Sequence, residues 1–110
     1  MKADDAFAAA LEDLLAPLGP IRRARFFGGQ GLRCGGSQFA MLMKGRLYLR
    51  ADGALAARLR ALGSEPFTYQ TRRGPVTVGA YHEVPVDLLD DPEALRELAA
   101  LALAAARSAP

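Results

Sequence analysis

The sequence predicts a two-layer α+β protein in which a mainly antiparallel sheet is flanked by helices. Three observations predict this fold class. Both ends of the chain carry apolar residues at helical spacing. The middle consists of strand-length apolar runs that glycines separate. Strands follow one another instead of alternating with helices, so βαβ units are not expected. The predicted order is α-β-β-β(β)-α-β-β-α.

The N-terminal segment predicts a helix with one apolar face. Asp4 or Asp5 can cap its start, because carboxylates accept hydrogen bonds from free backbone N–H groups. Pro17 and the Gly-Pro pair at 19–20 should end it. The face has to be buried, and a sheet is the expected cover. Its apolar residues lie three or four positions apart: Phe7, Leu11, Leu14, Leu15 and Leu18.

Residues 21–50 predict three or four antiparallel strands. The apolar runs end at glycines, which readily adopt the positive φ angles of tight turns. In the last run, Leu47 and Leu49 alternate with polar residues and Tyr48, so one face belongs to the core. The run 38–43 is apolar on both faces and predicts contacts on both. We therefore expect self-association, as a homodimer, through a sheet face or edge.

Residues 52–78 predict a helix followed by a hairpin. Asp52 should begin the helix and Gly63 should follow its end. The residues at 67–71 and 76–78 are β-branched or aromatic and flank a turn at 73–75, which indicates a hairpin. The apolar face of the helix should consist of Leu55, Leu59 and Leu62.

The last segment predicts a second long helix. The stretch Asp-Asp-Pro-Glu at 90–93 is typical of a helix start, because proline fits the first turn and acids favour the helix N-terminus. Since no repeat or linker is found, residues 1–110 should form a single domain. The buried stripe of this helix should comprise Leu95, Leu98, Ala99, Ala102 and Ala106.

The composition is that of a globular protein of the cytoplasm. Apolar residues make up 51% of the 110 residues and charged ones 24%. No apolar run approaches the roughly 20 residues that cross a bilayer. Asp4 and Asp5 stand where a signal peptide needs positive charge. The single Cys34 excludes an intrachain disulfide, as suits a reducing compartment.

The charge is unevenly distributed, although the net charge is only +2. Residues 22–60 contain nine basic residues and one acid, whereas residues 81–110 contain six acids and two arginines. The simplest interpretation is a sheet whose charge is offset by its helices. The alternative is a basic surface that meets an anion, a partner or nucleic acid. Its candidate residues are Arg22, Arg23, Arg25, Arg33, Arg46 and Arg50.

No catalytic, cofactor or metal site is predicted, and we expect a protein that is not an enzyme. The run 27–31 resembles a phosphate loop, but it lacks the Walker lysine and hydroxyl and precedes a strand. Cys34 and His82 lack a third orienting group and are too few for zinc. We interpret Cys34 as a buried thiol and His82 as a sheet-surface residue. The structural turn glycines should be Gly28, Gly29, Gly31 and Gly45.

Five motifs in order resemble the TfoX N-terminal domain family, from about residue 20 to residue 107. Residues 25–32 resemble its R-x-M-F-G-G-x-G-L opening, and residues 39–52 are similar to F-A-L-I-x-D-G-R-L-Y-L-K-A-D. Residues 63–69 resemble G-x-x-P-F-x-Y and residues 81–85 resemble Y-Y-x-x-P, whereas 88–106 match the closing helix. The main departures are Phe26 for methionine, Arg33-Cys34 for a more apolar pair, Lys44 for an acid and Leu98 for tryptophan.

The resemblance implies a fold like that of secretion chaperones and a link to regulators of bacterial competence genes. Those regulators resemble this domain joined to a helical C-terminal domain that the sequence does not match, so their regulatory role should carry over poorly. The leading hypothesis is a non-catalytic regulatory domain that acts by protein–protein contact and has no cofactor and no membrane contact. The alternative is a nucleic-acid-binding transcriptional regulator that uses the basic region 22–50.

Overall fold

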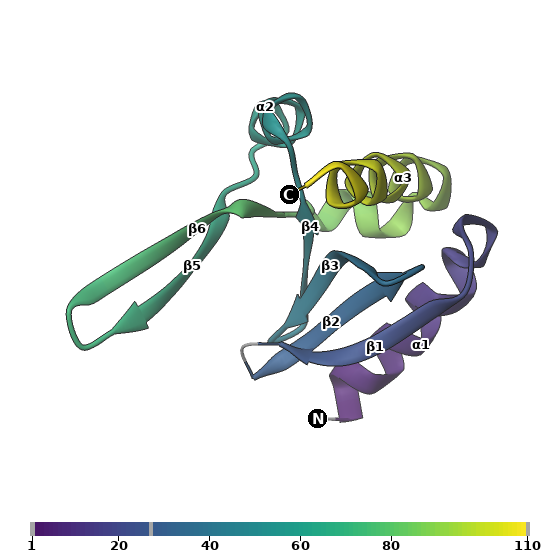
Figure 1. Cartoon of the computed structure of the whole chain (residues 1–110), viewed down its shortest axis with the longest axis horizontal. Coiled ribbons are helices and arrows are strands. Elements are labelled where there is room, and N and C mark those ends of the chain that lie inside the picture. The colour runs from purple at the N-terminus through teal and green to yellow at the C-terminus, as the bar shows by residue number, and fades with distance from the viewer. Residues whose placement is uncertain (1, 27, 110) are drawn as a thin grey trace.

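A computed structural model describes residues 2–26 and 28–109 and confirms the predicted α+β fold (Figure 1). None of the described helices combines the length and the apolar character needed to span a bilayer. The elements are α1 (Lys2–Leu14), η1 (Ala16–Leu18), β1 (Ile21–Phe26), β2 (Gly29–Cys34), β3 (Ser37–Met43), β4 (Arg46–Arg50), α2 (Gly53–Ala61), β5 (Pro66–Thr71), β6 (Gly74–Glu83), η2 (Val86–Asp90) and α3 (Pro92–Ser108), where η marks short 3-10 helices.

The six strands form one antiparallel sheet in the order β1-β2-β3-β4-β6-β5. Helix α3 packs on β3 and β4, α1 packs on β3, and α2 packs on β6. The helices and the buried residues of these strands form one hydrophobic core. We call this side of the sheet the helix face and the opposite side the open face.

Helix α1 starts earlier than predicted. It begins at Lys2, ahead of both expected caps. Asp5 lies inside the helix, and its Oδ1 accepts a hydrogen bond from Gln30 Nε2 at 2.9 Å. The Arg23 guanidinium is 3.8 Å from the same oxygen. The prediction that Asp4 or Asp5 caps the helix is wrong, because the Asp5 carboxylate binds polar groups of the neighbouring strands instead.

Both later helices begin at the predicted residue. The Asp52 side chain accepts a hydrogen bond from the Leu55 backbone N–H at 2.9 Å. The Asp91 side chain accepts one from the Ala94 N–H at 3.2 Å. A side-chain acceptor at this position satisfies one of the free N–H groups of the first turn. The predicted starts at Asp52 and within the stretch 90–93 are thereby confirmed.

The predicted buried faces of the later helices are confirmed with one exception. Leu55 and Leu59 are buried on α2, but Leu62 is 49% exposed. The helix ends at Ala61, and Gly63 with its φ of 91° turns the chain away, so Leu62 is not held against the core. The buried residues of α3 are Leu95, Leu98, Ala99, Ala102 and Leu103, with Ala106 half-buried beside them.

A bulge in β3 turns two consecutive residues toward the helices. Gln38 pairs with Arg33, whereas Ala40 pairs with Leu32, so Phe39 has no opposite residue on β2. Phe39 and Ala40 are both fully buried in the helix-face core. Because side chains alternate along a strand, the extra residue places Gln38 on the open face beside Arg33.

The hairpin of β5 and β6 projects from the body of the molecule (Figure 1). Pro66 pairs with His82, but the next residue, Phe67, pairs with Val78, so the part of β6 between these pairs has no opposite residue on β5. Unpaired extra residues bend a strand and increase its twist. Beyond this bend, residues 67–78 leave the body as a two-stranded extension, which we call the arm.

Candidate interaction surface

A second apolar cluster lies on the open face of the sheet. All its members come from strands, so no helix contributes to it. Met41 belongs to this cluster and Leu42 to the helix-face core, which confirms that the 38–43 strand makes apolar contacts on both faces. The open-face cluster consists of buried Met41, Tyr48, Phe67 and Tyr81, with Phe26, Met43, Tyr69, Val78 and Ala80 half-buried around them.

Aromatic contacts join the arm to the body. The ring of Tyr48 on β4 meets Phe67 of the arm edge-on, with centroids 5.2 Å apart and planes at 73°. Phe67 stacks on Tyr69 with a centroid separation of 5.9 Å. Edge-on and offset stacked pairs are the favoured arrangements of aromatic rings. Burial, with a further effect of the Glu83 carboxylate, raises the pKa of Tyr48, so its hydroxyl stays neutral.

The predicted turn glycines are of two kinds. Gly28 and Gly45 have φ angles of 79° and 77°, in the left-handed region that favours glycine. Gly29 and Gly31 instead lie inside β2 and have no positive φ. The prediction that these two are turn residues is wrong. Phe27, the first residue of the glycine run, lies outside the described residues.

Atoms of β3 lie close to Gly29 and Gly31, in the space that a side chain on either glycine would need. A Cβ on Gly29 would lie 2.2 Å from the carbonyl oxygen of Leu42, a backbone atom. A Cβ on Gly31 would lie 2.3 Å from Oε1 of Gln38. Separations this short are far inside van der Waals contact. Gly29 is therefore needed for the close approach of a backbone atom, whereas at Gly31 the neighbouring atom belongs to the Gln38 side chain.

The open face is strongly curved. Gln38 Nε2, above Gly31, donates a hydrogen bond to the Tyr81 hydroxyl of β6 at 3.1 Å. The rings of Phe26 on β1 and Tyr81 have centroids 5.6 Å apart. Three strands separate β1 from β6 in the sheet, so this contact requires the sheet to fold over its open face. Because Gly29 and Gly31 have no side chains, β2 leaves room for that curvature.

Strand alternation places four of the six candidate arginines on the open face. Arg22 is opposite Arg33 in the β1–β2 register, and Arg33 is opposite Gln38. Arg46 and Arg50 lie on either side of Tyr48 along β4, on the same face as this member of the open-face cluster. These four residues come from three strands, β1, β2 and β4.

The other two candidate arginines lie on the helix face. Arg23 Nε is 2.7 Å from Glu12 Oε1 of α1, which offsets its charge. Arg25 is exposed and lies opposite Gln30, the residue that binds Asp5 of α1. The six arginines therefore do not form one basic patch.

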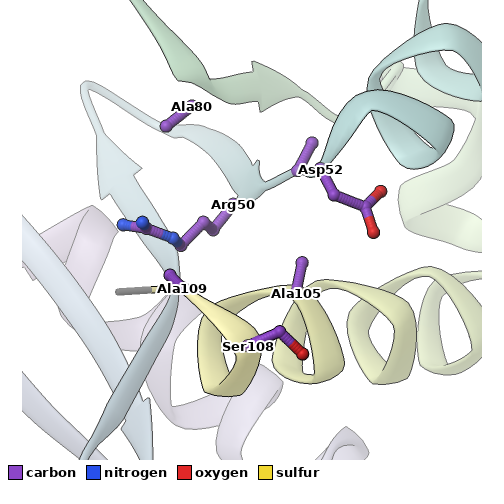
Figure 2. A pocket seen from close by; sticks show the side chains of 7 residues that line it. Arg50, Asp52, Ala80, Ala105, Ser108 and Ala109 are labelled. Atoms are coloured by element: carbon purple, nitrogen blue, oxygen red, sulfur yellow. The ribbon is translucent and has the colours of Figure 1, made fainter.

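Two of the open-face arginines have acidic neighbours. Arg46 Nη1 lies 3.3 Å from Glu83 Oε1, in an exposed ion pair of the kind that contributes little to stability. Arg50 lines a pocket of about 220 Å³ between the ends of β4 and α3, with the Asp52 carboxylate on the other side (Figure 2). The rest of the lining is Ala51, Ala80, Ala105, Ser108 and Ala109.

Cys34 and His82 lie on different strands of the sheet. Cys34, on β2, is buried, and its Sγ lies 3.5 Å from the carbonyl oxygen of Leu18. His82 is on β6, with β3 and β4 between the two strands. The interpretation of His82 as a surface residue is wrong, since only 3% of it is exposed. It shares the helix face with Leu49, its register partner, at the point where α2 covers β6.

We expect His82 to make the protein less stable in mild acid. Burial, together with the charge of Arg60, lowers the pKa of His82 below its ordinary 6.5, and its Nδ1 has no hydrogen-bond partner among the described residues. The unfolded state therefore binds a proton more readily, so stability present above about pH 6.5 is lost as the pH falls toward the folded-state pKa. Urea midpoints should decrease between about pH 7 and pH 5, and less so in His82→Gln. Equal slopes in the two proteins would contradict this role.

Sequence reasoning missed several residues that build the open face. Phe67, Tyr69 and Tyr81 were expected only as strand residues, and their alternation at 67 and 69 was a signal of a shared face. The part played by Gln38 had no signal, because it depends on the bulge at Phe39 and on the glycine beneath it.

Comparison with known proteins agrees with this description. The family "TfoX N-terminal domain" matches residues 13–106. A similar protein is the "DNA transformation protein TfoX1" of Aliivibrio fischeri (strain ATCC 700601 / ES114), 34% identical over 64 residues. That alignment covers 58% of this chain and 31% of the relative, so the chain matches less than a third of that protein. Since the family match extends over most of the chain, the protein belongs to the TfoX N-terminal domain family.

Proposed function

We propose that the chain is a non-catalytic interaction domain of bacterial DNA-transformation control, and that its open face binds an acidic, apolar segment of a protein partner. The family membership and the name of the Aliivibrio relative support the regulatory context. The interaction itself is supported by the chemistry of the open face, which carries arginines together with half-buried apolar residues such as Met43 and Val78.

One observation carries the proposal. Around the aromatic cluster, the described open face carries four arginines and a single acid, Glu83. Because Glu83 pairs with Arg46 and Arg50 shares its pocket with Asp52, Arg22 and Arg33 are the arginines of this face that have no acidic neighbour among the described residues. Clustered arginines raise the local concentration of acidic ligands and speed their association. A partner with acidic side chains beside apolar ones would complement this surface.

Nucleic acid remains the alternative, but the burial of the aromatic residues favours a protein partner. Single-stranded nucleic acids bind basic surfaces by stacking bases on exposed rings. Tyr48, Phe67 and Tyr81 are only 9%, 6% and 4% exposed, because they pack against one another and against their neighbours. Their ring faces offer little surface to a base.

The test compares two charge reversals on the same strand. Arg22 and Arg25 are both exposed residues of β1, but Arg22 lies on the open face and Arg25 on the helix face. With a labelled peptide that alternates glutamate with valine and phenylalanine, we expect Arg22→Glu to weaken binding by about tenfold. Arg25→Glu should weaken it by less than about twofold. Fluorescence anisotropy at low salt measures both.

Controls separate the proposal from general electrostatic attraction. The two variants have the same net charge, so an equal loss of peptide binding in both would contradict an open-face site. A matching peptide with lysine in place of glutamate should not bind. If duplex or single-stranded DNA binds more tightly than the acidic peptide and loses affinity steeply with salt, the nucleic-acid alternative is correct and the proposal fails.

A further inference from the structure

The arm presents a strand edge that pairs with no other strand of the described chain. Strand β4 pairs with β6 only over residues 81–83, and the Ala51 N–H then donates to the Ala80 carbonyl at 2.8 Å as β4 ends. Beyond that point, residues 74–78 pair with β5 alone among the described residues. A two-stranded hairpin is marginally stable in water, and a third strand stabilises it.

This edge has only part of the usual protection against pairing. No residue from Gly74 to His82 is charged, and Pro75, close to the tip, is the one residue there without an N–H donor. Val76 is 38% exposed on the apolar side of the arm. The outer edge strand β1, by contrast, carries three arginines. An uncharged, partly apolar edge of this length is suited to a further strand.

The two ends of the free edge differ in charge. At the tip, Arg72 and Arg73 are exposed and have no ion pair with a described residue. At the base lies the pocket of Figure 2, whose lining combines the Asp52 carboxylate, the C-terminal end of α3 and Ala80 with the Arg50 side chain. The last carbonyl groups of a helix carry partial negative charge and favour a cation.

We propose that a second copy of this chain occupies the free edge, so that two arms pair antiparallel through β6 and form a symmetric dimer. In this arrangement we place Val76 opposite Val76 of the partner on the two-fold axis, which makes the pairing of the two identical strands reciprocal. Counting outward from the axis, Pro75 faces Thr77 and Gly74 faces Val78, and the turn at Arg72 and Arg73 then lies near the Ala80 end of the partner's free edge. The arginines at each tip thus reach the Asp52 pocket of the other copy.

The proposed dimer places the two bodies at opposite ends of a four-stranded arm sheet. The arm projects away from the rest of the chain, so an antiparallel partner has room along it (Figure 1). Pairing stops where Ala51 already occupies the edge at Ala80, which limits the register. This inference concerns the arm and does not depend on what the open face binds.

A cysteine cross-link tests the edge and the register together. We expect Val76→Cys in the full chain to form a disulfide-linked dimer under mild oxidation, whereas Thr68→Cys should not. Thr68 is the matched control, because it lies in the same arm but on β5, whose edge is not used. Cys34 is buried and is present in both variants. Non-reducing electrophoresis and light scattering of the wild-type chain over a concentration series measure the result.

The arginines at the tip supply an independent readout. Arg72→Glu combined with Arg73→Glu should raise the dimer dissociation constant by about tenfold. Arg22→Glu combined with Arg25→Glu, with the same change in net charge but far from the arm, should leave it within about twofold. A wild-type chain that stays monomeric at every concentration, or Thr68→Cys that cross-links as fast as Val76→Cys, overturns the proposal.

Discussion

Replacing Phe39 by alanine is expected to lower the free energy of unfolding by about 3–5 kcal/mol. Phe39 is fully buried in the helix-face core, where the bulge of β3 holds it beside Ala40. Its removal leaves a cavity that the helices and the sheet can fill only by moving closer together. Because a domain of this size is stable by only about 5–15 kcal/mol, the variant should be close to unfolding at ambient temperature. Urea titration followed by circular dichroism measures the loss.

Phe26→Ala provides the matched control for this prediction. It removes the same side chain, but Phe26 is half-buried at the rim of the open-face cluster. Its loss removes less contact area and leaves a site open to water, so we expect a cost of about 1–2 kcal/mol. If both substitutions cost the same, the helix-face core would not be the dominant source of stability.

The sequence predicted the elements well, because each depends on local chemistry. Alternation along 46–50, the apolar spacing of the helices and the caps at Asp52 and Asp91 are all properties of neighbouring residues. Phe39 illustrates the limit. Its burial follows from a register shift between two strands, and strict alternation places it on the face opposite to Ala40. Local pattern cannot predict such a shift.

The candidate surface was less predictable than the fold. Composition revealed an excess of arginine in residues 22–50, but only the register assigns Arg22 and Arg23 to opposite faces. The prediction that His82 lies on the surface is wrong for a related reason. The residue is buried where α2, which is distant in sequence, packs on β6. A sequence pattern shows which residues of one strand share a face. A surface also depends on which faces of different strands the register places side by side.

Gly29→Ala is expected to be as damaging as the loss of a core side chain, at about 3 kcal/mol. The added methyl group would lie 2.2 Å from the Leu42 carbonyl oxygen, and a backbone atom in a central strand cannot move without breaking its ladder. At Gly31 the atom in the way belongs to the flexible Gln38 side chain. Gly31→Ala should therefore cost less, about 1–2 kcal/mol, mainly through the hydrogen bond to Tyr81. Thermal or urea unfolding of the two variants measures the difference.

Substitutions at two further glycines test whether the loss of stability comes from close approach of neighbouring atoms or from backbone conformation. Gly28 has open space but a φ of 79°, so Gly28→Ala should cost about 1–2 kcal/mol through strain alone. Gly79 has open space and no positive φ, so Gly79→Ala should be neutral or stabilising by up to about 1 kcal/mol. The expected order of cost places Gly29 first and Gly79 last. If Gly28→Ala were the most damaging, the main role of the glycine run would be to form the turn, and not to allow the close approach of β3 to β2.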